Sequence, residues 1–239
     1  MSSEALIEKF IYSCSHDLRG PVTTIQGLVK LAEEHPQLID LRDCIRMIGE
    51  CSGKLDNLIR GLQEFMQIES MNVEPSDIRM QEVIDEAIGN FNDQIEGNKI
   101  LIERNNDPVV WRTDPHCVEE ILKKVLSNCI TFRDLRKEAN TIAIAMEHRS
   151  GNLFLKIRDN GLGIPENQQS RLFNVFFRAH EISKGPGLGL FLAKRMVKKL
   201  GGAVAVVSVE GVGTTVIIRL PLLNGQHSTG LLSPILQAA

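Results

Sequence analysis

The sequence predicts an α+β protein in which an antiparallel helical hairpin is followed by an α/β sandwich domain. In the first part of the chain, apolar residues recur every three or four positions, the spacing of amphipathic helices. The segment 71–76 then interrupts this pattern with Asn, Pro and Ser. Beyond it, short runs of alternating apolar residues, typical of strands, are mixed with further helical patterns.

Composition excludes several classes of protein. The 239 residues are 43% hydrophobic and 24% charged, as in ordinary soluble domains, and a net charge of −3 gives no reason to expect a nucleic-acid partner. No apolar run approaches the roughly 18 residues of a membrane span, and the N-terminus does not resemble a signal peptide. Five scattered cysteines without a CxxC pair fit reduced thiols, so we expect a cytoplasmic protein.

The hairpin is predicted from two helical segments. The first covers residues 3–34, and Pro21 is expected to bend it just after His16. The second covers residues 37–70 and carries an apolar seam at heptad-like spacing: Leu38, Leu41, Ile45, Ile48, Ser52, Leu55, Ile59, Leu62 and Met66. A connection of only a few residues makes the two helices antiparallel.

Two helices alone cannot enclose a core. We therefore expect a second copy of the chain to complete a dimeric four-helix bundle through residues 3–70. The alternative is a monomeric hairpin that is covered by the downstream domain. Residues 1–70 are thus predicted to form the hairpin domain and residues 71–223 the sandwich domain, and residues 224–239 are predicted to form a loosely ordered tail.

The sandwich domain is predicted to contain a mixed, largely antiparallel sheet with helices on one face. We expect strands at 78–80, 99–104, 109–112, 141–148, 153–157, 204–209 and 214–220, and helices at 81–91, 115–130 and 187–200. Asp114 and Pro115 are typical of a helix start.

The first chemical group that stands out is His16, which is followed by Asp17 and, one turn along the helix, by Arg19. A lone histidine on a helix surface is usually just solvated. Here Asp17 could accept a proton or orient the ring, and Arg19 could meet phosphate oxygens. A neutral imidazole is also a competent nucleophile.

Two glycine-rich segments follow in the second half of the chain. The first, 159–165, directly follows a predicted strand, and Asp159 could accept a hydrogen bond from an amino group such as that of adenine. The second, 185–190, directly precedes a helix, where free amides and a positive helix end could receive phosphates. Each segment could instead be a simple tight turn. Neither a dinucleotide-binding fingerprint nor a P-loop is present.

Other candidates lie around these segments. Three phenylalanines within 172–178 precede a short polar stretch that could form a lid, with Arg178 and Lys184 as candidate phosphate contacts. The side-chain oxygen of Asn128 is suited to Mg²⁺, although a helix-capping role would also explain it.

Taken together, these segments resemble the catalytic core of a two-component sensor histidine kinase, over nearly the whole chain to about Leu223. Residues 15–21 look like the H box of that family, 126–129 the N box, 159–163 the G1 box, 173–177 the F box and 185–190 the G2 box, and 211–214 match its late GxGT turn.

The resemblance implies an ATP-binding sandwich of the Bergerat type joined to a dimeric helical bundle, with ATP and Mg²⁺ as cofactors. It implies that His16 accepts the γ-phosphoryl group, with Asp17 as base, and passes it to a response regulator. It further implies that adenine binds Asp159 and Mg²⁺ binds Asn128. The remaining implied nucleotide contacts are Gly161, Gly163, Lys184, Gly185, Gly187, Leu188, Gly189 and Thr214.

Three positions depart from the family pattern. Lys124 stands where a further Asn is common, and Thr131 where a Lys is common. Gly20 replaces the Thr or Asn of members that also dephosphorylate their partner, so we expect poor phosphatase activity. Two alternative functions are a non-catalytic dimeric nucleotide-binding adaptor, which Lys124 and Thr131 favour, and a histidine phosphotransfer relay, which the glycine boxes disfavour.

Overall fold

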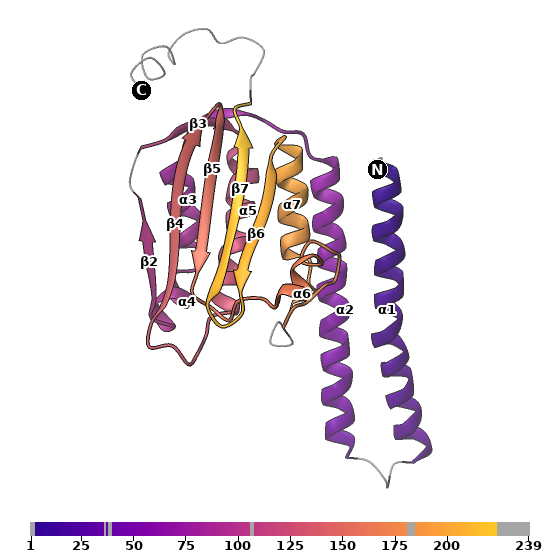
Figure 1. Cartoon of the computed structure of the whole chain (residues 1–239). Coiled ribbons are helices and arrows are strands. Elements are labelled where there is room, and N and C mark those ends of the chain that lie inside the picture. Colours follow the sequence, from indigo (N-terminus) through magenta and orange to yellow (C-terminus); the bar gives the residue numbers. More distant parts are fainter. Residues whose placement is uncertain (1–2, 36, 38–39, 106–107, 181–184, 224–239) are drawn as a thin grey trace.

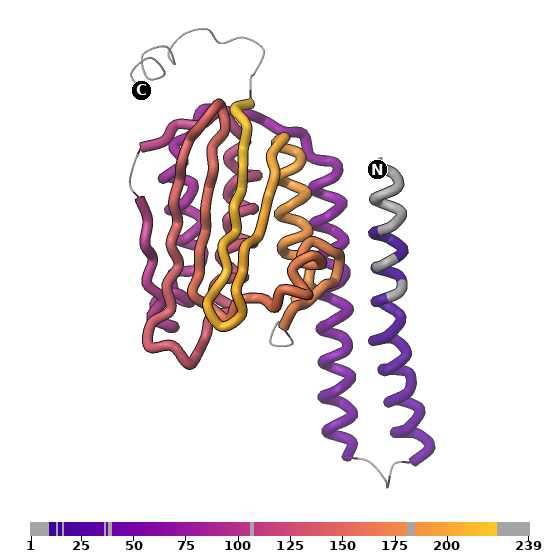
Figure 2. The backbone as a smooth tube through the Cα atoms, in the orientation of Figure 1, coloured from indigo at the N-terminus to yellow at the C-terminus, as the bar shows by residue number. Residues whose placement is uncertain are grey.

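The computed structural model describes residues 3–35, 37, 40–105, 108–180 and 185–223, except the side chains of residues 3–9, Ser13 and His16. A helical hairpin stands beside a sheet domain (Figure 1). The turn end of the hairpin projects beyond that domain (Figure 2). The predicted tail, residues 224–239, lies outside the described residues, and so does Pro36 of the His35-Pro36 junction.

The hairpin consists of α1 (Ser3–Glu34) and α2 (Leu41–Ser70). Helix α1 continues through Pro21. Helix α2 begins later than the predicted residue 37, because Asp40 caps it: its carboxylate accepts a hydrogen bond from the backbone N–H of Arg42 at 2.8 Å. No helix within the described residues is long and apolar enough to cross a membrane.

The sheet domain confirms the predicted mixed, largely antiparallel sheet. Its five strands lie in the order β2-β4-β5-β7-β6, and only the β2–β4 pair is parallel. Their bounds are β2 (Ile100–Arg104), β4 (Asn140–Arg149), β5 (Asn152–Asp159), β6 (Ala203–Val209) and β7 (Gly213–Pro221). Strands β1 (Ser76–Arg79) and β3 (Val110–Thr113) form a separate antiparallel pair.

Three main helices cover one face of this sheet (Figure 1). They are α3 (Met80–Gly89), α5 (Pro115–Thr131) and α7 (Gly189–Lys199). Asp114 caps α5, as predicted, by accepting from the N–H of Cys117 at 2.9 Å. The short helices α4 (Asn92–Gly97) and α6 (Glu166–Gln169) were not predicted, because neither is long enough to show a helical period.

One hydrophobic core extends from the sheet domain into the hairpin. Phe10 of α1 stacks on Phe65 of α2 with ring centroids 4.0 Å apart, and both rings lie within 6 Å of Phe191 on α7. The sheet domain therefore covers one side of the hairpin within a single chain.

Helix α2 carries two apolar stripes on different sides. The stripe that packs within the chain is Cys44, Cys51, Leu58 and Phe65, at heptad spacing. The seam predicted from the sequence is divided by the fold. Its residue Leu62 packs against the core, and Ile48 and Leu55 are partly buried. The seam residues Leu41, Ile45, Ile59 and Met66 are 60%, 62%, 48% and 46% exposed and form a second, exposed stripe.

Candidate functional site

A cavity of about 890 Å³ lies between the sheet domain and α2. From the sheet domain it is lined by most of the predicted site residues: Asn128, Asp159, Gly163, Gly185, Gly187, Leu188, Gly189 and Thr214. Gly161 is not part of the lining but contacts Asp159 directly. Helix α2 contributes the opposite wall, which the sequence analysis did not predict, through Asn57, Arg60, Gly61 and Glu64.

Asp159 is the carboxylate that the sheet domain contributes to this cavity. It ends β5, and its Oδ1 accepts hydrogen bonds from the N–H groups of Gly161 at 2.8 Å and Thr214 at 3.2 Å. Burial raises the pKa of Asp159, while these amides, the thiol of Cys129 and the charge of Lys137 oppose that rise. The carboxylate of Asp159 is thus fixed in position and largely buried. It can accept a hydrogen bond, as recognition of an exocyclic amino group requires.

The loop after β5 packs closely against the end of α5 on one side and the β6–β7 turn on the other. Gly163 has φ +66°, and a Cβ there would collide with the carbonyl group of Val209. The N–H of Leu162 donates to the carbonyl of Phe132 at 2.9 Å, and its own carbonyl accepts from Gly211 at 2.7 Å. A glycine is therefore required at position 163 to keep this loop against the β6–β7 turn.

The first turn of α7 forms a second part of the cavity. Gly187, with φ +75°, leads into α7, whose N-terminus has no side-chain cap. Free amides and the helix dipole make such an end attractive to anions. The amide group of Asn128 lies about 3.8 Å from where a Cβ of Gly189 would be. An oxygen donor suited to a hard cation and an anion-binding helix end therefore share one side of the cavity.

The F-box segment closes another side. Phe173 and Phe177 lie under the cations of Lys194 and Arg171, at 4.4 and 4.6 Å. Farther along, His180 Nε2 lies 2.7 Å from the carbonyl oxygen of Gly163. The predicted contact Lys184 lies outside the described residues, whereas Arg178 lines the cavity.

The predicted phospho-acceptor lies on α1, and no described residue of α1, Asp17 included, lines the cavity. The side chain of His16 is not among those described, but its backbone is helical. Because α1 and α2 are antiparallel and Phe10 stacks on Phe65, the helix position of His16 is level with about residue 59 of α2. That level lies between Asn57 and Gly61, which line the cavity. Burial, and to a smaller extent the charge of the neighbouring Asp17, raise the pKa of Cys14 to about 11.

Three basic residues of the sheet domain bind α2. Lys124, which departs from the family pattern, forms an ion pair with Glu64 at 2.5 Å. Arg195 of α7 pairs with Glu69 at 2.6 Å, and Lys199 donates to the carbonyls of Glu69 and Met71. The cation of Lys124 is therefore engaged by the hairpin, a contact that no local sequence signal could indicate.

Comparisons with known proteins agree with this geometry. The His Kinase A phospho-acceptor domain family matches residues 6–70, and the histidine kinase-, DNA gyrase B- and HSP90-like ATPase family matches residues 113–224. Together they cover well over half of the chain.

Named relatives extend over nearly the whole chain. The methanogenesis regulatory histidine kinase FilI of Methanothrix harundinacea is 28% identical over 92% of this chain, and sensor histidine kinase RcsC of Escherichia coli is 27% identical over 91%. The chain spans only about a quarter of the length of each, 25% and 24%. The histidine kinase ThkA, solved in complex with the response regulator TrrA, shares the fold with a TM-score of 0.68 at 20% identity, covering 92% of this chain and 63% of that one.

Both domains occur here in one chain and in the order found over the matched parts of these relatives. The chain therefore belongs to the two-component histidine kinases, and it comprises the phospho-acceptor hairpin and the ATPase domain of their catalytic core.

Proposed function

We propose that this chain is an ATP-dependent protein histidine kinase that phosphorylates His16 and passes the phosphoryl group to an aspartate of a response regulator. The observation that carries the proposal is the single cavity that Asp159, Asn128 and the start of α7 share. The two matched families and the relatives named as histidine kinases support it.

The lining suits ATP. Asp159 would accept a hydrogen bond from the adenine amino group, and Gly163 and Thr214 would border the base. The backbone from Gly185 to Gly189 would surround the phosphates at the N-terminus of α7. We retain Lys184 as a proposed phosphate contact and Leu188 as a residue of the nucleotide wall, where its side chain also contacts Gly61.

A magnesium ion would be held mainly by the nucleotide. Within the described residues, no group of three His, Cys, Asp or Glu side chains could hold a metal by itself. The amide oxygen of Asn128 is a suitable hard donor beside the proposed phosphate position. We therefore propose Asn128 as the protein ligand of Mg²⁺, with phosphate oxygens and water completing the coordination.

The proposed chemistry is an in-line displacement. A neutral ring nitrogen of His16 would bond to the γ-phosphorus as the bond to the bridging oxygen of ADP breaks, and Asp17 would take the ring proton. ATP supplies the phosphoryl group, and the protein supplies position and charge neutralisation. The boundary we propose between the domains, at residues 70 and 71, coincides with the end of α2 and would let the ATPase domain approach His16.

We also propose a homodimer through residues 3–70, in which the exposed stripe of α2 meets a second copy. Leu41, Ile45, Ile59 and Met66 supply the apolar surface that such a bundle needs. The complex of the related ThkA with TrrA supports a response regulator as the partner, and we propose that both act in the cytoplasm.

Incubation with γ-labelled ATP and Mg²⁺ tests the proposal. We expect a label that survives base and is lost in acid. The label should disappear in His16→Gln and Asp159→Asn, whereas the control His35→Gln, at the other end of α1, should be labelled normally.

Two results would contradict it. ATP binding without labelling would favour the adaptor, and the absence of both would favour the relay.

A further inference from the structure

We propose that Lys137 is a positioning residue for Asp159, because its ammonium group ties together the two loops whose amides hold that carboxylate. The inference rests on the proposed nucleotide-binding function. It concerns a residue outside the cavity lining, in the connection between α5 and β4.

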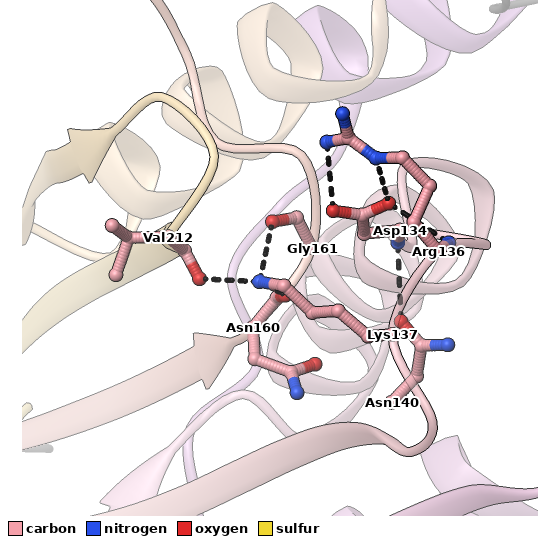
Figure 3. Close-up of polar contacts among 7 residues, drawn as sticks. All are labelled: Asp134, Arg136, Lys137, Asn140, Asn160, Gly161 and Val212. Atoms are coloured by element: carbon pink, nitrogen blue, oxygen red, sulfur yellow. Dashed lines mark hydrogen bonds and ion pairs between the residues drawn. The ribbon is translucent and has the colours of Figure 1, made fainter.

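Asp134 holds the connection that carries Lys137 through several hydrogen bonds (Figure 3). The buried Asp134 accepts hydrogen bonds from the backbone N–H of Arg136 at 3.0 Å and from its guanidinium at 2.8 and 2.9 Å. Its own N–H donates to Oδ1 of Asn140 at 3.1 Å. Arg136 lowers the pKa of Asp134 to about 2, so this anchor is ionised at any ordinary pH.

From this anchored turn, the Lys137 side chain reaches three backbone carbonyls (Figure 3). Its Nζ donates to the carbonyl of Asn160, to that of Gly161 at 3.4 Å, and to that of Val212 at 3.0 Å. An ammonium has three donors, and each of them has an acceptor here. Two of these carbonyls belong to the loop after β5, and the third to the β6–β7 turn.

The amides that hold the carboxylate lie beside these carbonyls. Gly161 is in the loop after β5, and Thr214 is at the start of β7, directly after the β6–β7 turn; both donate to Oδ1 of Asp159. Lys137 therefore joins the loops through their carbonyls, while Asp159 joins them through their amides. Loss of the ammonium would leave the two loops joined by the Leu162–Gly211 backbone hydrogen bond and by the carboxylate itself, and the position of the carboxylate would be less well defined.

The charge of Lys137 also favours the ionised form of Asp159, the form that accepts these hydrogen bonds. Two titratable side chains of the described residues act on Asp159: Cys129 from α5, through a hydrogen bond, and Lys137, through its charge. Burial raises the pKa of Asp159 and the ammonium counters part of that rise. Replacing Lys137 by a neutral residue should therefore raise the pKa of Asp159 further.

The test compares Lys137→Met, which keeps the length of the side chain, with Lys156→Met. Lys156 is an exposed lysine of β5 whose cation pairs with Glu147 at 3.2 Å. We expect Lys137→Met to weaken ADP binding about tenfold in calorimetry, because charge-assisted hydrogen bonds are lost. On acidification, the affinity of this variant for ADP should begin to fall at a higher pH than that of the wild type. Lys156→Met should match the wild type in both respects.

Hydrogen exchange of the nucleotide-free protein separates this inference from the proposed function. Lys137→Met should exchange faster at residues 160–163 and 211–214, with the helices α1 and α2 unchanged. Faster exchange there supports the clamp even if the wild type binds no ADP, a result that would overturn only the proposed function. Unchanged exchange, or ADP affinity within twofold and an unshifted pH profile, would overturn the role of Lys137.

Discussion

The hairpin and the sheet domain differ in how completely one chain buries their apolar residues. The sheet domain encloses its core: Leu153, Leu155, Ile157 and Ile218 on the inner face of the sheet are at most 1% exposed. In the hairpin, α2 buries Leu58 and Phe65 against its own chain, yet Ile45 and Ile59 remain about half exposed or more, at 62% and 48%.

This difference shows that α2 presents two apolar stripes with different surroundings. One stripe belongs to the fold of the single chain, because it contacts α1 and α7. The other stripe has no such partner within the described part of the chain, and its exposed area favours a second chain. The four predictions that follow test this division, in order of decreasing effect.

Phe65→Ala should cause the largest loss of stability. Phe65 is fully buried between Phe10 and Phe191, so its removal leaves a cavity where hairpin and sheet domain meet. We expect the free energy of unfolding to fall by about 3–5 kcal/mol, measured by urea titration. A loss below about 1.5 kcal/mol would mean that the two regions do not share a core.

Ile59→Asp should act on association instead. A carboxylate on the exposed stripe would be buried without a partner in the proposed dimer, so we expect that dimer to weaken at least about 100-fold, near 3 kcal/mol, in sedimentation equilibrium. The control Gln67→Glu places a charge on α2 at another exposed position and should leave the dimer intact. Unchanged association of the Asp variant would assign the dimer contact to another surface.

Asp159→Asn should affect the sheet domain alone. Since the pKa of Asp159 is raised in the fold, its ionised form destabilises the protein at neutral pH, and the penalty is relieved as pH falls through the folded pKa. We expect the variant to melt about 2–4 °C higher at pH 7 while losing ADP binding. The difference should shrink on acidification, and a constant difference from pH 7 to pH 4 would contradict this origin.

Lys124→Met should have the smallest effect. Its ion pair with Glu64 joins side chains that are 23% and 44% exposed, so solvent screens it and we expect a loss below about 1 kcal/mol. ADP affinity should rise slightly as α2 is held less firmly. Lys123→Met is the matched control, because Lys123 pairs only with Glu119 and Glu120 of its own helix among the described residues. Equal ADP affinities in the two variants would argue against the Lys124 contact.

Local pattern was enough to predict most of the fold. Alternation identified β4 and β5, and Asp114 with Pro115 identified the start of α5. Pattern could not show which stripe of α2 packs within the chain, because Ile59 and Leu58 are both apolar and their surroundings come from distant segments. The decisive contact, Phe65 with Phe191, joins residues that are far apart in sequence.

The residues of the candidate site likewise fall into those that a local sequence pattern predicts and those that depend on distant contacts. Asp159 was predictable because a carboxylate at a strand end, followed by glycines, has a local signature. Lys137 was not, since its partners are backbone carbonyls, which every residue possesses and no sequence pattern reveals. Lys124 was noticed only as a departure from the family, and its partner Glu64 became apparent through the packing of α2.

Side chains of the sheet domain hold the connection between hairpin and sheet domain at two points. Lys199 holds the carbonyls of Glu69 and Met71, and Asp114 accepts from the N–H of Glu74 at 2.9 Å. Both attachments are made by the sheet domain, since Lys199 ends α7 and Asp114 caps α5. The end of α2 is therefore fastened to that domain at two points only a few residues apart. A rotation of the hairpin at residues 70 and 71 would have to release the contacts of Lys199 first.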